Sequence, residues 1–297
     1  MEFASPASIP AWLRSSNPDV FRRLGGIRQV LFDFDGTLSL LRQGWEGVMV
    51  PMMLEAICGD SPTPEIAREV EDYVDRSTGI LTIRQMEWLA KAARRYGKSP
   101  AVLTAGAYKS MYLQRLMVFV NERMACLAQG KSLPDDYLVA GARLFIGELA
   151  RRGARLYLAS GTDHADVLRE AKALGLLACF DGGVYGALDD DEAHAKERVI
   201  QRMMDQNQLA GDELLIVGDG PVEIREGKRR GALTLGVASD ELVHYGWNPR
   251  KAARLQEAGA DLLVADFTHT ADLIALLYQE ATLASHFDSE SNARKEY

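Results

Sequence analysis

Short apolar runs alternate with amphipathic segments over the second half of the chain. The runs at 154–159, 214–217, 233–237 and 262–264 show no polar alternation, and segments with helical spacing separate them. One further run of this kind, 27–32, stands near the N-terminus. Strands without alternation are buried on both faces. The pattern therefore predicts an α/β fold with a parallel sheet covered by helices on both sides.

A different pattern fills the stretch between the first and second of these strands. Residues 44–129 show helical periodicity with few strand signals. Thr63 and Pro64 are typical of a helix start with proline at the first helical position. Thr82 and Gln85 predict a capping box at the start of another helix. An insertion of this size made only of helices indicates a separate cap domain.

We therefore expect two domains. Residues 1–43 and 130–297 should form the α/β core, and residues 44–129 the helical cap. The first helix after the cap is expected over 136–152. Residues 1–26, which contain three prolines, are expected to form an irregular arm with one or two helical turns.

Two carboxylates follow the first predicted strand. The sequence DFDGT places Asp33 and Asp35 two positions apart, followed by Gly36 and Thr37. Side chains of an extended chain alternate between faces, so both aspartates can point to the mouth of the sheet where α/β proteins bind ligands. Neighbouring carboxylates repel each other unless a cation or a shared proton compensates them. The pair therefore favours a hard metal ion such as Mg²⁺.

Three later stretches complete a larger pattern. The strand at 154–159 ends in SGT, which begins at Ser160; Lys196 opens a helical segment; and the strand at 214–217 ends in GDGPVE, which contains Asp219 and Glu223. With DFDGT, these pieces resemble the four motifs of the haloacid dehalogenase superfamily of phosphohydrolases, in the family's order. The resemblance is to members with a helical cap, such as phosphoglycolate phosphatases and β-phosphoglucomutases. It implies a Rossmann-like core with an inserted all-helical cap.

The resemblance also implies a reaction. It suggests Mg²⁺-dependent hydrolysis of a small phosphomonoester, with a sugar phosphate expected, through an aspartyl-phosphate. Asp33 is the expected nucleophile. Asp35 is expected to protonate the leaving alcohol and then to activate water. The expected metal ligands are Asp33, the backbone carbonyl of Asp35, Asp219 and Glu223. Glu223 stands where the family more often has aspartate, so it either ligates through water or only orients one.

Other residues are expected to bind the phosphoryl group. Ser160 and the backbone N–H of Gly161 lie at a strand-to-helix junction, where free amides attract anions. Thr37 is expected nearby. The resemblance assigns Lys196 to neutralise the phosphate and the nucleophile, and Lys172 and Lys228 are the alternatives.

Residues near the cap are candidates for substrate recognition. Arg42 and Trp45 lie on the segment that leads from DFDGT into the cap, and Arg76 lies in a polar turn between two predicted cap helices. A guanidinium and an indole suit a polar, hydroxylated leaving group such as a sugar. An ordinary loop between helices is the alternative for the turn at 76–79.

The net charge, the cysteines and the lengths of the apolar runs exclude several kinds of partner. The net charge of −8 and the lack of a basic stripe argue against a nucleic-acid partner. The three cysteines are scattered, and no apolar run of 18 residues occurs, which argues against a metal-binding cysteine cluster and a membrane partner. We expect a soluble cytoplasmic protein, a monomer or a homodimer, whose partner is a small phosphate ester.

Two other functions stay open at this stage. A phosphosugar mutase shares all four motifs and differs by transferring the phosphoryl group back to its product before water attacks. A non-catalytic module that binds a phosphate ligand is the alternative from another class. Such modules usually lose an aspartate, whereas this chain has the complete set.

Overall fold

The computed structural model describes residues 9–59, 61–78, 80–97, 101–187, 204–208 and 211–280. Within these residues, seven strands form one sheet in the order β1-β7-β6-β5-β2-β3-β4. The strands are β1 (Leu13–Ser15), β2 (Gln29–Phe32), β3 (Arg155–Asp163), β4 (Gly183–Ala187), β5 (Leu214–Gly218), β6 (Leu233–Val237) and β7 (Leu262–Val264). All neighbouring strands are parallel except β1, which is antiparallel to β7.

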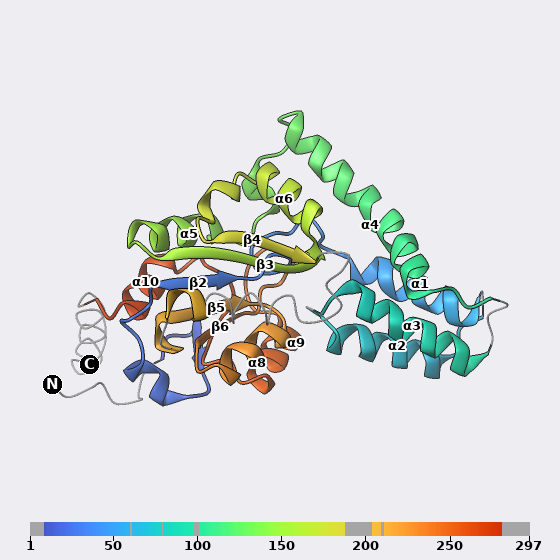
Figure 1. Cartoon of the computed structure of the whole chain (residues 1–297), viewed down its shortest axis with the longest axis horizontal. Coiled ribbons are helices and arrows are strands. Elements are labelled where there is room, and N and C mark those ends of the chain that lie inside the picture. The colour runs from blue at the N-terminus through green and yellow to red at the C-terminus, as the bar shows by residue number, and fades with distance from the viewer. Residues whose placement is uncertain are drawn as a thin grey trace, which may run out of the picture.

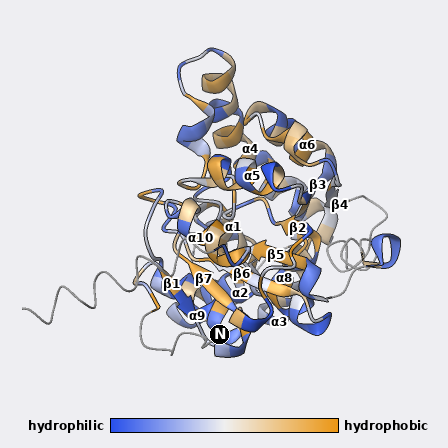
Figure 2. Cartoon of the chain, turned by 90° about the vertical axis from the view of Figure 1, so that its left-hand side faces the viewer, coloured by the Kyte–Doolittle hydropathy of each residue, from blue (hydrophilic) through white to orange (hydrophobic). Residues whose placement is uncertain are grey.

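Both faces of this sheet are buried, as the unbroken apolar strands predict. Along β2, Val30 and Phe32 pack into one hydrophobic cluster and Leu31 into another. Helices α5 (Ala142–Arg151), α6 (His164–Ala173) and α10 (Thr270–Leu277) contribute to the first cluster. Helices α8 (Pro221–Arg229) and α9 (Pro249–Glu257) cover the opposite face. The apolar strands between more polar helices are visible in Figure 2. The expected α/β fold with helices on both sides is confirmed.

Four helices make up the cap. They are α1 (Glu46–Cys58), α2 (Pro64–Arg76), α3 (Thr82–Tyr96) and α4 (Ala105–Ala128). Their buried side chains form a hydrophobic cluster of their own, and α4 extends from this cluster to pass alongside α6 (Figure 1). The separate cluster is the reason why we propose the domain boundaries 1–43 and 130–297 for the core and 44–129 for the cap.

The N-terminus of α2 has the cap that its sequence predicts, and the N-terminus of α3 does not. Thr63 accepts a hydrogen bond from the backbone N–H of Ile66 at 3.5 Å, and Pro64 is the first residue of α2, as predicted. The predicted capping box of Thr82 is wrong, because Leu81 is the N-cap of α3. Gln85 instead donates to Ser77, so a tertiary contact has displaced the local one.

The helix predicted over 136–152 is also shorter than expected. A short 3₁₀ turn, Pro134–Tyr137, comes first, and α5 begins only at Ala142. The residues between them pair with the loop that follows β2: Leu40 donates to the Tyr137 carbonyl at 2.8 Å, and Val139 donates to the Leu38 carbonyl at 3.0 Å. These hydrogen bonds hold the backbone extended and delay the helix.

Two edge strands were not predicted. β1 lies within the arm expected to be irregular, and β4 follows α6. Both are short, and β1 contains the polar residues Arg14 and Ser15. Pairing with β7 and β3 creates these strands, so their own hydrophobic pattern is too weak to predict them.

The left-handed turn at Gly141 offers a test of this packing. Gly141 has φ of 76°, and a Cβ there would overlap the carbonyl oxygen of Phe267. Gly141→Ala should lower the free energy of unfolding by about 2–4 kcal/mol in urea titrations followed by circular dichroism. Gly147→Ala is the matched control, because nothing lies within 4 Å of its Cβ position in α5. The control should be stabilising by about 0.5–1 kcal/mol. Equal effects of the two substitutions would contradict this packing.

Candidate active site

The predicted motifs meet where three adjacent strands end. β2 lies between β5 and β3, and Phe32 is in register with Val217 on one side and Leu158 on the other. Asp33, Asp219 and Ser160 each follow within two residues of those positions. Neighbouring parallel strands end at one edge of the sheet, so chain segments far apart in sequence supply a single site.

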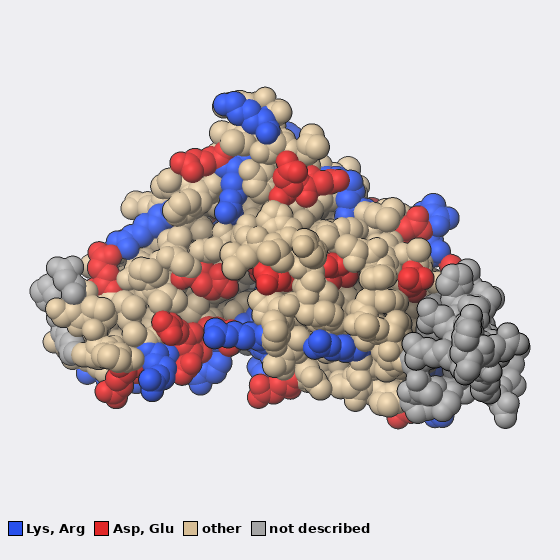
Figure 3. Space-filling model, turned by 180° about the vertical axis from the view of Figure 1, so that it is seen from behind, with Lys and Arg blue, Asp and Glu red and all other residues tan. Residues whose placement is uncertain are grey.

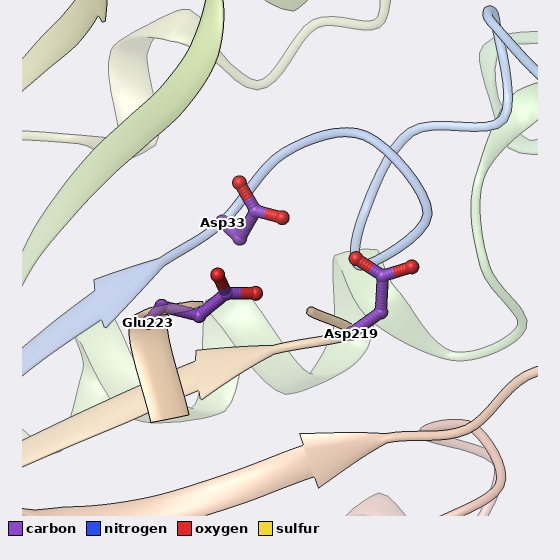
Figure 4. A group of neighbouring side chains, drawn as sticks. All are labelled: Asp33, Asp219 and Glu223. Carbon is purple, nitrogen blue, oxygen red and sulfur yellow. The ribbon is translucent and has the colours of Figure 1, made fainter. Parts of the chain in front are cut away.

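Three buried carboxylates form the centre of this site. Asp33, Asp219 and Glu223 each offer an oxygen, and these oxygens lie within 4.8 Å of one another (Figure 4). Glu223 is oriented by the backbone N–H of Gly220, which donates to its Oε1 at 2.7 Å. Buried carboxylates this close need a compensating cation. Their hard oxygen atoms and spacing fit a divalent metal ion, whose ligands would be these three residues.

Asp35 is held differently from the other carboxylates. Ser160 Oγ and Thr162 Oγ1 both donate to Asp35 Oδ2, at 3.2 and 2.9 Å. Asp35 Oδ1 is buried and accepts no hydrogen bond from the described residues. It lies 3.8 Å from the guanidinium of Arg42. One oxygen of Asp35 is therefore fixed by hydroxyl groups, and the other is left available for a proton.

Thr162 is a site residue that sequence reasoning did not select. Ser160 was expected at the start of a helix. It lies inside β3 instead, because β3 continues to Asp163 and α6 begins only at His164. In the extended chain, Ser160 and Thr162 are two positions apart and both reach Asp35. The alternation of side chains in the tripeptide SGT was the signal that could have found Thr162.

Arg42 borders the site, but carboxylates surround its guanidinium. It contacts Glu170 at 2.7 Å and Asp166 at 3.4 Å, both on α6, in addition to Asp35. Burial alone would lower the pKa of Arg42, but Asp35, Glu170 and Asp166 outweigh burial and raise this pKa above its ordinary value. The guanidinium predicted to contact substrate thus ties the loop after β2 to α6.

A second buried cation, Lys251, was missed from the sequence. Its Nζ lies 2.7 Å from Asp219 Oδ2 and 2.5 Å from Glu241 Oε1. Burial lowers the pKa of Lys251, but attraction to Asp219 and Glu241 is stronger, and the net pKa is raised. Lys251 lies on α9, outside any motif, so nothing local to it indicated this position.

A cavity of about 90 Å³ opens between this site and the cap. Asp33, Asp35, Asp219, Ser160, Gly161, Thr162 and Arg42 line it from the core, and Trp45, Thr78, Ile80, Thr82, Gln85 and Tyr112 line it from the cap. A larger hollow of about 430 Å³ lies along α5 and includes none of the predicted site residues. We place the site in the smaller cavity because the acidic cluster borders it.

The remaining predicted residues fall in different places. Thr37 Oγ1 donates to Asp219 at 3.3 Å, which puts it beside the cluster. Arg76 is away from the cavity, because its side chain is exposed and donates to the Asp72 carbonyl of its own helix. Lys196 lies outside the described residues. Of its alternatives, Lys228 pairs with Asp261 at 2.5 Å, and neither it nor Lys172 lines the cavity.

The family follows from comparison with known proteins. A model of the haloacid dehalogenase-like hydrolases matches residues 27–231. The chain belongs to this family. The match confirms the family that the four motifs predicted and shows that the chain is a hydrolase. No curated protein matches the chain.

Solved structures similar to this haloacid dehalogenase-like hydrolase confirm its fold. A predicted phosphoglycolate phosphatase from Haemophilus somnus has a TM-score of 0.58 at 15% identity, covering 84% of this chain and 98% of that one. β-Phosphoglucomutase from Clostridium difficile has a TM-score of 0.58 at 12% identity, covering 86% and 99%. CbbY from Rhodobacter sphaeroides, in complex with phosphate, has a TM-score of 0.52 at 20% identity, covering 81% and 95%.

Two features of the exterior complete the description. Basic and acidic side chains are interspersed over the face seen in Figure 3, without a broad region of one sign there. None of the described helices has the length and apolar character needed to cross a membrane.

The ion pair of Arg42 and Glu170 can be tested through stability. Arg42→Met should lower the free energy of unfolding by about 3–5 kcal/mol, because it leaves the fully buried Glu170 uncompensated. Adding Glu170→Met should recover about half of that loss. Arg169→Met is the control, since Arg169 only pairs with Asp166 at the surface, and should cost less than about 1 kcal/mol.

The loss of stability in Arg42→Met should depend on pH. Burial raises the pKa of Glu170 even though Arg42 opposes the shift, and removing Arg42 should raise it further. The folded state then binds more protons than the unfolded state between the two pKa values, so stability falls as the pH rises. The deficit of Arg42→Met should shrink from about pH 8 to about pH 5. A deficit that does not change with pH would contradict the ion-pair account.

Proposed function

We propose that this hydrolase is a Mg²⁺-dependent phosphatase that cleaves a small phosphomonoester, a sugar phosphate or a similar ester, through an aspartyl-phosphate. The observation that carries the proposal is the acidic cluster of Asp33, Asp219 and Glu223 with Asp35 across the same cavity. A nucleophilic carboxylate beside a metal site, with a second carboxylate for proton transfer, supplies the groups that phosphoryl transfer needs.

In the first half-reaction, Asp33 attacks the phosphorus atom and the bond from phosphorus to the leaving oxygen breaks. Asp35 gives its proton to that oxygen, so the product leaves as a neutral alcohol. Ser160 and Thr162 hold one oxygen of Asp35 and thereby orient the other. When bound, Mg²⁺ neutralises the charge that gathers on the phosphoryl and carboxylate oxygens.

In the second half-reaction, Asp35 has lost its proton and acts as a base. It takes a proton from water, the water oxygen attacks phosphorus, and the bond from phosphorus to Asp33 breaks to release inorganic phosphate. We assign Gly161 and Thr37 to the phosphoryl oxygens, and Lys196 to their charge. The similar CbbY structure in complex with phosphate supports a phosphate site on this fold.

The nucleophile can be tested by substitution and by trapping. Asp33→Asn should lower kcat by at least about 1,000-fold, because an amide cannot form the phosphoenzyme. Acid-quenched wild-type enzyme should carry a phosphoryl group on Asp33 by peptide mass spectrometry, and the variant should carry none. Asp19→Asn, which alters an exposed aspartate paired only with Arg22, should keep normal activity. Near-normal turnover by Asp33→Asn would place the nucleophile elsewhere.

The metal site makes a second prediction. Asp219→Asn should weaken Mg²⁺ binding at least about tenfold in isothermal titration calorimetry, because it removes one charged oxygen ligand. Exhaustive chelation should abolish phosphate release, and added Mg²⁺ should restore it. Asp19→Asn again serves as the control for the loss of one carboxylate. Full activity after chelation would remove the metal from the mechanism.

A further inference from the structure

The described side chains that the cap presents to the cavity are uncharged. The described residues that line it from this side are Trp45, Thr78, Ile80, Thr82, Gln85 and Tyr112. Asp33, Asp35 and Asp219 line the opposite side. A phosphoester whose phosphoryl group meets the acidic cluster therefore places its leaving group against neutral polar and aromatic surface.

The cations that the structure describes around this cavity pair with carboxylates. Arg42 faces Asp35, Asp166 and Glu170, and Lys251 faces Asp219 and Glu241. Two more cations bridge the core and the cap: Arg254 pairs with Asp75 at 2.7 Å, and Lys109 pairs with Asp163 at 2.6 Å. An anionic leaving group could gain one of these cations only in competition with its carboxylate partner.

Two buried cap residues can instead recognise hydroxyl groups. Tyr112 is only 4% exposed and lines the cavity. Gln85 is also buried, and its amide nitrogen donates to Ser77 at 3.1 Å, which leaves its Oε1 for another partner. Both side chains line the cavity, so a ligand there can form hydrogen bonds with them.

We propose that the leaving group of the substrate is an uncharged, hydroxylated alcohol that carries neither a carboxylate nor a second phosphate, recognised by Tyr112 and Gln85. This inference rests on the proposed phosphatase function and narrows its substrate class. A second anion in this cavity would lose its hydration, meet no described cation that lacks a carboxylate partner, and lie close to four carboxylates.

The inference excludes two reactions for this chain: the hydrolysis of phosphoglycolate and the phosphosugar mutase reaction. Phosphoglycolate would place a carboxylate on the neutral cap surface. A mutase that returns the phosphoryl group to its product passes through a doubly phosphorylated sugar, whose second phosphate would meet the same surface. A cationic group on the cap side would stabilise either anion, and the described cap residues that line the cavity supply none.

A matched pair of substrates tests the charge of the leaving group. 2-Hydroxyethyl phosphate and phosphoglycolate have the same number of carbon atoms and differ in a hydroxymethyl against a carboxylate group. With Mg²⁺, kcat/KM for 2-hydroxyethyl phosphate should exceed that for phosphoglycolate by at least about tenfold. Competition against p-nitrophenyl phosphate should rank the two esters in the same order. Glucose 1-phosphate and glucose 1,6-bisphosphate form a second pair with the same expected preference.

A variant on the cap tests the recognition group. Tyr112→Phe should lower kcat/KM for 2-hydroxyethyl phosphate by about tenfold and for p-nitrophenyl phosphate by less than about twofold. Tyr108→Phe is the matched control, because it removes a buried hydroxyl one turn earlier on α4 that accepts from the Leu103 N–H. The control should leave the ratio between the two esters unchanged.

The outcomes separate this inference from the proposed function. Equal or preferred cleavage of phosphoglycolate, with active enzyme, overturns the uncharged leaving group and leaves the phosphatase assignment standing. An equal loss for every ester in Tyr112→Phe overturns the recognition role of Tyr112. No release of phosphate from p-nitrophenyl phosphate or any other ester overturns the proposed function, and this inference falls with it.

Discussion

Mutual repulsion among buried carboxylates is the constraint on which the site depends. The ends of β2 and β5 and the first turn of α8 bring Asp33, Asp219 and Glu223 within 4.8 Å of one another, and Asp35 lies nearby. Such a cluster is stable only if positive charge is brought to it. The structure supplies part of that charge through Lys251 on Asp219 and leaves room for a cation among the three carboxylates.

This constraint extends from the site to the joint between the domains. Arg42 lies on the segment that leaves the core for the cap, and its contacts with Glu170 anchor that segment to α6. Arg123 of α4 donates to the carbonyl groups of Leu40, Leu41 and Gln43, which fixes the same crossing. Arg254 links Asp75 of the cap to the carbonyl of Asp219. The cations that organise the carboxylates therefore also hold the cap over them.

Features that depend on residues close in sequence could be predicted. Features that depend on contacts between distant segments of the chain could not. The central strands and the position of Asp33, Asp219 and Ser160 at their ends follow from apolar runs with a polar residue after each. Lys251 and Tyr112 carry no local pattern, because each acquires its place from packing. Arg42 shows the same limit: its partner Glu170 lies on a helix far along the chain, so the sequence does not predict this ion pair, and the substrate role expected of Arg42 stays a prediction. The missed edge strands β1 and β4 also arise from pairing rather than from their own composition.

The distribution of charge suits the core to bind the phosphoryl group and the cap to bind an uncharged leaving group. Cations committed to carboxylates are unavailable to a ligand unless their buried partners lose compensation, which is costly. The core can therefore bind one dianionic phosphoryl group only with the help of an added cation. The described cap residues that line the cavity carry no positive charge for a second anion. Hydroxyl and amide groups such as those of Tyr112 and Gln85 discriminate by hydrogen bonding, and they reject a partner that cannot satisfy them. The same fold can accept other leaving groups by placing a cation on the cap, so the choice of substrate depends on a few cap side chains and not on the strands that hold the chemistry.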